Sequence, residues 1–300
     1  MLLASFWLTM QLTLDFGYWL TLLLALPAAG LVVRLFLIQH DCGHGSFFRS
    51  RWANDLLGRA ISVVTLTPYD QWRKAHANHH AHSGNLDHRG IGDIDMLTVD
   101  EYRQRSKMAR LRYRLYRSPL ILFCVGPVYQ FVFKQRFCVE APGEGPFNWS
   151  IIATNVAIAL VVMTGMLIFG PMDFLLVQAP ITIVASIAGV WLFYVQHQFD
   201  GTYWKRGENW SFSDAALKGS SHYDLPGLMS WFSADIGLHH IHHLCSKIPN
   251  YRLRECLRGN PWLAAETRFG FWRSLATMRL ALWDERRERL VGFDQLKHLC

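Results

Sequence analysis

The chain is organised around residues 237–244, Gly237-Leu238-His239-His240-Ile241-His242-His243-Leu244, which follow a long apolar region. Histidine fills four of the five positions from 239 to 243. His239, His242 and His243 are spaced i, i+3 and i+4, so on a helix their side chains project from one face. Three imidazoles on one face make half of a metal site, which needs ligands from elsewhere in the chain.

The same spacing occurs twice upstream. His76-Ala77-Asn78-His79-His80 repeats the i, i+3, i+4 pattern, and His40-Asp41-Cys42-Gly43-His44 contains an i, i+4 pair, so eight of the fourteen histidines lie in three same-face clusters. A single zinc ion takes about four ligands, so eight or nine imidazoles indicate two metal ions. The spacing leaves iron, copper, nickel and zinc open, although redox-active iron with open positions is the usual means of activating O₂.

Composition places the chain in a membrane. It has 300 residues, of which 51% are hydrophobic and 18% charged, too apolar for an ordinary soluble domain and too short for several domains. We therefore expect one domain over residues 1–300. The net charge of +7 suggests a basic cytoplasmic face. The six cysteines form no CxxC pair and are interpreted as reduced thiols, and the N-terminal segment lacks the features of a cleaved signal peptide.

Apolar segments predict four membrane-spanning helices in two hairpins, at about residues 1–14, 18–38, 149–169 and 174–195. The first would be only about 21 Å long against a hydrocarbon core of about 30 Å. Each hairpin turn, 15–17 and 170–173, carries one Asp and no Lys or Arg. The positive-inside rule then places residues 39–148 and 196–300 in the cytoplasm. The expected fold is an all-α integral membrane protein with a cytosolic helical cap.

Shorter segments of the cytosolic regions have their own patterns. Residues 56–66 are apolar but too short to span, and residues 120–133 contain Gly126-Pro127 and are expected to be interfacial or re-entrant. Residues 141–146 read as a loop. Residues 262–290 are interpreted as an amphipathic helix carrying several arginines.

A strongly basic segment covers residues 100–118, where seven cations stand against Asp100 and Glu101. The cations are Arg103, Arg105, Lys107, Arg110, Arg112, Arg114 and Arg117. One interpretation is a solvated or membrane-surface helix that contacts lipid phosphates. The other is a docking site for an acidic electron donor. Nucleic acid explains the segment poorly because it lies within a membrane protein.

The predicted topology places all three histidine clusters on one side of the membrane, where they can share a site. A single such cluster could be surface residues of an amphipathic helix, but three clusters with the same i, i+4 pair argue against that alternative. His197 lies at the inner end of the last span, at the same depth. His82, His88, His222 and His298 fit no same-face pattern and are expected not to be ligands. His240 lies off the face of its neighbours and is expected to support the site.

Polar residues beside the clusters are candidates for the outer part of the site. A metal-bound imidazole usually donates its other N–H to a carboxylate or a carbonyl. The candidates are Asp41, Asn78, Asp93, Asp95 and Asp235. Turn and cap roles remain an equally open alternative for each of them.

With these motifs the chain resembles the membrane fatty acid desaturase family. The three boxes H-x₃-H, H-x-x-H-H and H-x-x-H-H appear in order, with a transmembrane hairpin between the second and third. Further stretches are similar to the bacterial acyl-lipid type, and the similarity covers roughly residues 18–260. These stretches are 40–48, 83–87, 92–99, 195–199 and 248–251. The chain departs from the pattern at Asp235, where we expect Asn, and at His222, where we expect an aromatic residue.

The resemblance implies a diiron site on the cytosolic face of a multi-pass protein, here of the bacterial inner membrane. Its ligands would be the eight box histidines and His197, which matches the position at a transmembrane helix end. It also implies that O₂ and two electrons are consumed for each double bond formed in an acyl chain held in a hydrophobic tunnel. The chain has no cytochrome b5 signature and no GxGxxG motif, so the electrons would come from a separate ferredoxin-like donor or a flavoprotein chain.

Two alternatives to a desaturase remain. A related diiron membrane hydroxylase, or a carotenoid ketolase or hydroxylase, would use similar histidine boxes, although the residues around the boxes favour the desaturase. A membrane metal transporter belongs to a different class. It predicts ionisable residues within the spans, and residues 149–169 and 174–195 contain no Asp, Glu, Lys or Arg.

Overall fold

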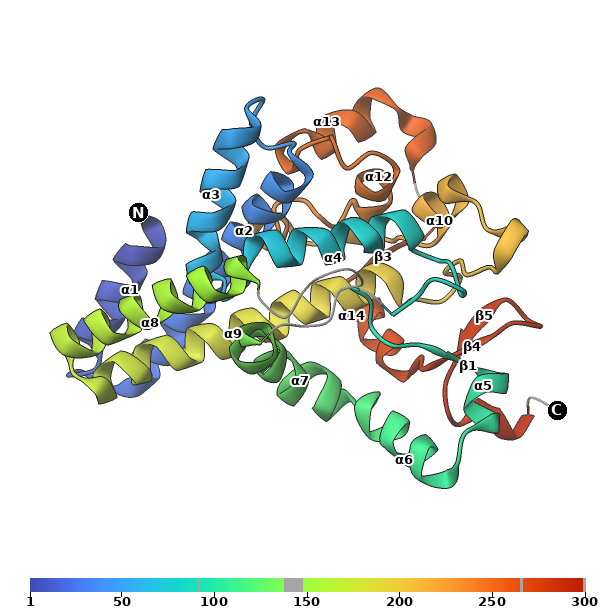
Figure 1. Cartoon of the computed structure of the whole chain (residues 1–300), viewed down its shortest axis with the longest axis horizontal. Helices are drawn as coiled ribbons and strands as arrows, with labels where there is room; N and C mark the ends of the chain where they lie inside the picture. The colour runs from blue at the N-terminus through green and yellow to red at the C-terminus, as the bar shows by residue number, and fades with distance from the viewer. Residues whose placement is uncertain (91, 138–147, 265–266, 299–300) are drawn as a thin grey trace. The chain divides into compact units, whose positions relative to one another are not determined.

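The computed structural model describes residues 1–90, 92–137, 148–264 and 267–298, without the side chain of His298. The loop expected at 141–146 lies outside the described residues. The chain is mostly helical and forms two compact units (Figure 1). The first unit comprises Met1–Arg73, Val125–Val190 and Trp231–Ala234. The second comprises Lys74–Cys124, Trp191–Ser230 and Asp235–Cys300.

The first unit is built from long apolar helices. Its elements are α1 (Leu2–Thr13), α2 (Tyr18–His44), α3 (Arg51–Val64), the start of α4 (Tyr69–His82), α7 (Gly126–Val128), η2 (Tyr129–Phe133), η3 (Lys134–Arg136), α8 (Trp149–Phe169) and most of α9 (Pro171–His197). In Figure 1, α8 and α9 run side by side as a hairpin. The ring of Trp7 in α1 packs edge-on against Phe169 at 4.9 Å between centroids, and its indole N–H donates to Gln178 Oε1 at 3.1 Å.

Among the described residues, three helices are long and apolar enough to cross a membrane, and they match the last three predicted spans. They are Tyr18–His44, Trp149–Phe169 and Pro171–His197. The predicted first span forms α1, an apolar helix of 12 residues, which is shorter than these. The pieces Lys107–Tyr116 and Ile121–Arg136 form a bent pair, as a broken span or a re-entrant loop would. The count of four spans therefore stays a prediction.

Two of the long helices extend further than the apolar pattern indicated. Helix α2 continues to His44 and ends at Gly45, whose left-handed backbone (φ 65°) lets its N–H bond the carbonyls of Asp41 and Cys42. Helix α9 continues to His197. The first histidine box and His197 therefore each lie on the final turns of a long apolar helix, which fixes their direction.

The second unit combines short helices with two small sheets. Its elements include the rest of α4, β1 (Leu97–Thr98), α5 (Val99–Gln104), α6 (Lys107–Tyr116), most of η1 (Ile121–Val125), the end of α9, η4 (Gly207–Asn209), α10 (Phe212–Lys218), β2 (His222–Asp224) and most of α11 (Gly227–Phe232). They continue with α12 (His239–Leu244), α13 (Asn250–Gly259), η5 (Pro261–Leu263), β3 (Arg268–Gly270), α14 (Phe271–Ser274), η6 (Leu275–Arg279), β4 (Leu282–Asp284), β5 (Arg289–Val291) and η7 (Gln295–His298). Strand β4 pairs in parallel with β1 and antiparallel with β5, and β2 pairs in parallel with β3.

The prediction of an amphipathic helix over residues 262–290 was wrong. This segment forms β3, two short helical turns and β4 instead. Leu282 and Trp283 of β4 are 0% and 2% exposed, and they pair with Leu97 and Thr98, nearly 200 residues earlier in the chain. A continuous apolar run such as Leu280-Ala281-Leu282-Trp283 suits a buried strand, but its partner strand lies too far away in sequence for local periodicity to reveal it.

The basic segment is less uniform than its sequence suggested. Arg117 is buried, and its guanidinium donates to Gln198 Oε1 at 3.2 Å and to the Leu280 carbonyl at 2.8 Å. The interpretation of Arg117 as a surface cation was therefore wrong. Helix α6 carries Arg110 and Arg112 outside the core, in keeping with either interpretation of the remaining segment. The described cysteines, Cys42, Cys124, Cys245 and Cys256, are free thiols.

Candidate metal centre

Three elements of the second unit carry histidines towards one another. The second box lies at the end of α4, His197 ends α9, and the third box forms α12. Gly237 allows α12 to approach β2, because a Cβ at this position would lie 2.1 Å from the Tyr223 carbonyl oxygen. The Tyr223 N–H in turn donates to the Gly237 carbonyl at 2.7 Å. This close backbone contact fixes where the third box begins.

Four buried histidines form the first candidate metal-holding group, here called the four-histidine group. Its members are His79, His197, His239 and His243. One ligand nitrogen of each lies within 4.8 Å of the others. The Nε2 atom of His197 lies 3.1 Å from His79 Nε2 and 3.0 Å from His239 Nε2. All four residues belong to the second unit, so this group is complete within one compact unit.

His76, His80 and His242 form a neighbouring group in the same unit. His80 Nε2 lies 3.1 Å from both His76 Nε2 and His242 Nε2. Each H-x-x-H-H box is therefore divided between two groups. The second box contributes His76 and His80 to the neighbouring group and His79 to the four-histidine group. The third box does the reverse: His239 and His243 belong to the four-histidine group, and His242 belongs to the neighbouring group. The i, i+3, i+4 spacing predicts each box as one half-site, whereas the folded chain divides each box between two groups.

The protonation of His79 and His197 follows from their other contacts. Asp93 accepts from His79 Nδ1, and the Gly219 carbonyl lies 3.2 Å from His197 Nδ1. A carboxylate or carbonyl accepts only, so in each neutral ring the proton is on Nδ1 and the lone pair is on Nε2. With both rings neutral, the two Nε2 atoms that face each other at 3.1 Å would have no proton between them. Two facing lone pairs are stable when a cation binds both, which fits a metal.

His243 supports the same interpretation. Its Nε2 atom is buried without a hydrogen-bond partner among the described residues. Burial, followed by the neighbouring imidazoles of His80, His239, His197 and His79, holds the pKa of His243 well below its usual range. The ring is therefore neutral and presents a lone pair, the form in which histidine binds a transition metal. A buried, unpaired nitrogen is rare in proteins and is explained here by a metal ligand.

The first box belongs to the first unit. His40 and His44 occupy the last turns of α2, with ring centroids 4.7 Å apart. His40 Nδ1 lies 3.3 Å from Asp41 Oδ1, the kind of carboxylate contact expected for a ligand histidine. The Tyr69 hydroxyl donates to the Cys42 carbonyl at 2.8 Å, which ties this turn to α4. Both imidazoles are thus held on a well-anchored helix end.

The remaining predicted residues have varied contacts. His240 Nε2 donates to the Leu263 carbonyl at 2.8 Å, so His240 supports the loop after α13. Asp235 accepts from the Ser230 hydroxyl at 2.9 Å and pairs with Arg254 at 2.7 Å. The Asn78 carbonyl accepts from His82 Nδ1 at 3.0 Å. Within the described residues, the candidate metal groups do not include His82, His88 or His222. The side chain of His298 lies outside those residues.

The structure also adds residues that the sequence analysis missed. A small pocket beside the four-histidine group is lined by His79, Asp93, His197 and five further residues, namely Ser83, Ile94, Phe193, Gln198 and Trp204. The Phe193 ring lies 5.2 Å from the His79 ring and 5.5 Å from the His197 ring. Phe193 precedes His197 by four positions on α9, and this spacing was a usable signal. Trp204 had no local signal, because it reaches the pocket through tertiary folding.

The sequence is also similar to those of known proteins. A family model described as "Fatty acid desaturase" matches residues 17–274. A "Fatty acid desaturase" of Bacillus subtilis is 44% identical over 299 residues, covering 98% of this chain and 83% of that protein. An "sn-1 acyl-lipid omega-3 desaturase (ferredoxin)" of Synechocystis is 32% identical over 231 residues, covering 73% of this chain and 61% of that protein. An "sn-1 oleoyl-lipid 12-desaturase" of the same organism is 28% identical over 235 residues, covering 73% and 62% respectively.

Proposed function

The chain belongs to the fatty acid desaturase family, and from this premise we propose that it is an O₂-dependent desaturase acting on the acyl chain of a lipid. The reaction would introduce one carbon–carbon double bond and reduce O₂ to water. The observation that carries the proposal is the buried four-histidine group, whose facing Nε2 lone pairs suit a metal cation. The names of the two Synechocystis relatives support a lipid-bound acyl chain as the substrate.

We propose two iron ions as the metals. The four-histidine group would hold one, and His76, His80 and His242 would contribute to the other. We include His40 and His44 as ligands of the second ion because of their i, i+4 spacing and the box pattern of the family. Bound iron would supply the oxidising power that breaks unactivated C–H bonds with O₂.

The chain's own residues would hold and shield this chemistry. Asp93 accepts the Nδ1–H of His79 and the Gly219 carbonyl accepts that of His197, so both rings are kept in the ligand tautomer. Phe193 packs against both rings and limits the access of water. All four members of the group are buried. These contacts orient the ligands before any substrate arrives.

An apolar pocket in the first unit is our candidate for part of the acyl-chain path. It is lined by residues of α2, the end of α3, η2 and α9, including Val33, Phe36, Phe131, Ile181 and Ala185. Aliphatic and aromatic walls suit a hydrocarbon chain, which gains free energy by leaving water. The polar side chains of Gln178 and Ser186 also reach this pocket.

We further propose that residues 1–300 form one desaturase domain with four spans in two hairpins, multi-pass in a bacterial inner membrane. The charge bias of the turns favours an active site on the cytoplasmic face. The electrons would come from a separate donor protein, either ferredoxin-like or a flavoprotein chain. The printed name of one Synechocystis relative includes ferredoxin, which supports the first of these.

Expression in a host followed by analysis of fatty acid methyl esters tests this function. Gas chromatography with mass spectrometry should detect a new double bond. His79→Ala should abolish formation of the double bond and lower the iron content while the protein still inserts in the membrane. The control His88→Ala changes an exposed histidine outside the candidate metal groups and should still form the double bond. A product that gains an oxygen atom without a double bond would favour a hydroxylase, and full activity of His79→Ala would remove this box from the mechanism.

A further inference from the structure

We propose that an acidic protein carrying one electron at a time docks at the surface pocket between α5 and the β4–β5 turn, and that its electrons reach the four-histidine group past Trp283 and Trp204. This inference rests on the proposed function, because a desaturase needs an external reductant. It assigns a docking place and a route that lie entirely within the second unit.

The pocket is a defined depression in the second unit with a volume of about 210 Å³. Its lining is polar and charged apart from one valine: Thr98, Val99, Asp100, Arg103, Asp284, Glu285, Arg286 and Arg287. Thr98 is the register partner of Trp283 in the β1–β4 pair, and Asp284 follows Trp283 directly. Trp283 therefore lies immediately behind the wall of the pocket.

From Trp283 the route inward runs through one hydrophobic cluster to the small pocket beside His79 and His197. Trp283 and Trp204 are 2% and 6% exposed and belong to one hydrophobic cluster, together with Leu86, Met96 and Leu290. Trp204 also lines the small pocket beside His79 and His197. Packed protein atoms couple a donor and an acceptor better than a solvent-filled gap does, so this cluster offers a path from the surface to the candidate metal ligands.

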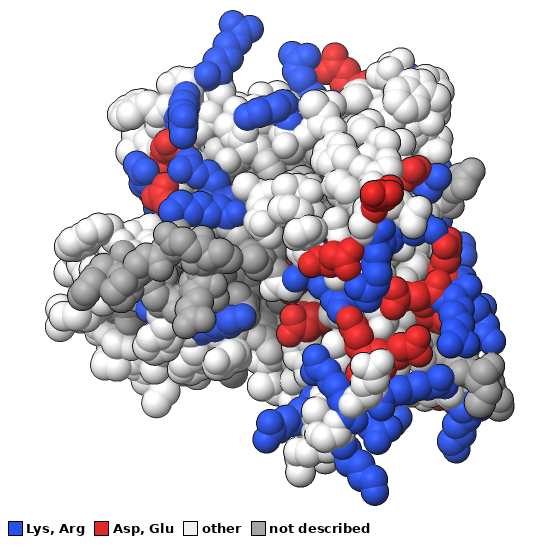
Figure 2. Space-filling view, turned by 45° about the vertical axis from the view of Figure 1, so that its right-hand side comes forward, with Lys and Arg blue, Asp and Glu red and all other residues white. Residues whose placement is uncertain are grey.

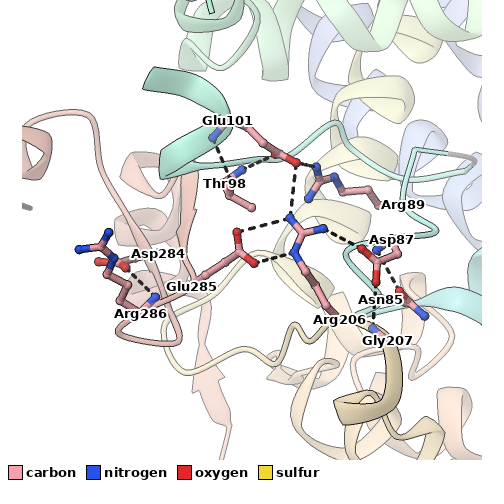
Figure 3. A network of polar contacts seen from close by, with 10 residues as sticks. All are labelled: Asn85, Asp87, Arg89, Thr98, Glu101, Arg206, Gly207, Asp284, Glu285 and Arg286. Atoms are coloured by element: carbon pink, nitrogen blue, oxygen red, sulfur yellow. Dashed lines mark hydrogen bonds and ion pairs between the residues drawn. The ribbon is translucent and has the colours of Figure 1, made fainter. Parts of the chain in front are cut away.

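Two of the three carboxylates that line the pocket, Asp284 and Glu285, are paired within the chain. Figure 3 shows Arg206 between Glu285, Asp87 and Glu101, with nitrogen–oxygen distances of 2.6, 2.7 and 3.6 Å. Asp284 accepts from the backbone N–H groups of Arg286 and Arg287 and from the Arg287 guanidinium at 3.0 Å. Asp284 and Glu285 therefore serve to hold the fold together.

Cations outnumber acidic residues around the pocket. Among residues 99–116, six Lys or Arg stand against Asp100 and Glu101, and residues 284–289 add Arg286, Arg287 and Arg289 against Asp284, Glu285 and Glu288, so nine cations stand against five acidic residues. In the view of Figure 2, many Lys and Arg side chains lie on the right-hand side, with Asp and Glu among them. A surface of this sign attracts an acidic partner and speeds its association at low salt.

A protein partner fits the pocket better than a lipid surface does. Helix α6 has an exposed apolar stripe, Met108, Leu111 and Leu115, at a spacing that suits contact with lipid. The pocket lining has no such stripe, and its charged groups resemble the rim of a protein interface. We therefore assign the pocket to the electron donor and treat a headgroup contact as the outcome that would contradict it.

The electron count requires two docking events for each turnover. Forming one double bond removes two hydrogens, with two electrons, from adjacent methylenes of the acyl chain. Reducing O₂ to two waters takes four electrons and four protons. The donor therefore supplies the other two electrons, one at a time, and is oxidised once in each event, while two protons come from water.

The test uses the iron-loaded full chain in nanodiscs with reduced plant-type ferredoxin, an acidic one-electron carrier. Arg103→Glu with Arg286→Glu should raise the KM for ferredoxin about tenfold and weaken binding of redox-inactive gallium ferredoxin to a similar extent. The matched control, Arg110→Glu with Arg112→Glu on α6, makes the same charge change outside the pocket and should alter neither value by more than about twofold. Turnover driven by dithionite with a small mediator, and the iron content, should be unchanged in both variants.

The route is tested separately. Trp283→Phe should slow ferredoxin oxidation at saturating donor by several-fold while the KM for ferredoxin stays at the wild-type value. Trp283→Leu, with Tm and iron content measured alongside, checks that the loss follows the removal of the aromatic ring. The route would be overturned if ferredoxin were oxidised at the wild-type single-turnover rate both by Trp283→Phe and by a folded Trp283→Leu variant.

The outcomes separate this inference from the proposed function. Absence of a double bond even with dithionite would defeat the proposed function. A double bond with dithionite, combined with an unchanged ferredoxin KM in Arg103→Glu/Arg286→Glu or an equal rise in the α6 control, would overturn the docking site alone. The pocket variant could instead lower turnover equally with ferredoxin and with dithionite, and only in nanodiscs that contain phosphatidylglycerol. That result would assign these arginines to lipid headgroups and would also overturn the docking site.

Discussion

When both rings are neutral, the Nε2 atoms through which His79 and His197 face each other carry no proton, and most of the chemical argument depends on this arrangement. It depends on Asp93 and the Gly219 carbonyl, which accept the opposite N–H of each ring. Asp93 was a candidate from sequence as one of several acidic or amide residues near the boxes. Its selection over Asp235, which pairs with Arg254, required the positions of the side chains.

Asp93→Asn tests the role of this carboxylate. The amide no longer offers the charged acceptor that fixes the His79 tautomer, so iron affinity should fall about 10–100-fold. Iron content after dialysis against a graded chelator series, measured by plasma mass spectrometry, reports the change. Asp95→Asn, at an exposed neighbour on the same segment, is the control and should bind iron as the wild type does. Equal iron affinity in both variants would show that Asp93 does not orient the ligand.

His222 predicts a dependence of stability on pH. Burial, and then the neighbouring His240, lowers the pKa of His222 to about 4, whereas an unfolded histidine titrates near about 6.5. Between these values the unfolded chain binds a proton that the folded chain does not, so stability falls as the pH drops from about 6.5 to about 4. His222→Phe removes this contribution, and its Tm in detergent should fall less over that range. His88→Phe should keep the wild-type slope, and an identical slope in His222→Phe would contradict the argument.

At the scale of elements, the apolar pattern located the long helices well and the short elements poorly. Helix α8 has the predicted bounds, Trp149–Phe169, because an uncharged run of that length has few alternatives to a spanning helix. The segment 262–290 was misread because its strands β3 and β4 pair with residues 222–224 and 97–98. Local periodicity carries no information about a partner so distant in sequence.

Helix α12 depends on Gly237 for its position. A methyl group there would meet the Tyr223 carbonyl at 2.1 Å, and backbone on both sides must then shift. Gly237→Ala should lower the free energy of unfolding by about 1–3 kcal/mol and reduce iron content, since the third box moves with the helix. Thermal unfolding and metal analysis provide the measurements. Gly227→Ala, where a Cβ meets nothing within 4 Å, should leave both values close to wild type. Normal iron binding by Gly237→Ala would contradict the assigned constraint.

At the scale of the whole molecule, the candidate ligands are distributed unequally between the two units. The four-histidine group lies within the second unit, whereas His40 and His44 belong to the first. The two proposed irons should therefore differ in their dependence on the first box. This asymmetry has no counterpart in the sequence, where the three boxes look equivalent.

His40→Ala with His44→Ala tests this asymmetry. The double variant should retain about half of the wild-type iron, since the four-histidine group keeps all its members, and should lose desaturation. His79→Ala with His239→Ala removes two members of that group and leaves the five proposed ligands of the second ion, so it should also retain about half of the iron, bound at the other site. Iron per chain and the Mössbauer spectrum of the enriched protein distinguish the cases. Complete loss of iron from the first variant would show that the two ions bind only together.

The sequence by itself determined the class of this protein. Box spacing, uncharged spans and charge bias are local or compositional properties, and they sufficed for the helix-borne imidazoles, the membrane helices and the family. The tertiary structure decided how each box divides between two metal groups, which carboxylate fixes His79, and which aromatic residues connect a surface pocket with the ligands. The physical reason is range: helix periodicity and hydropathy are set by neighbours in the chain, whereas tautomers, burial and packing are set by atoms that folding brings together from distant positions.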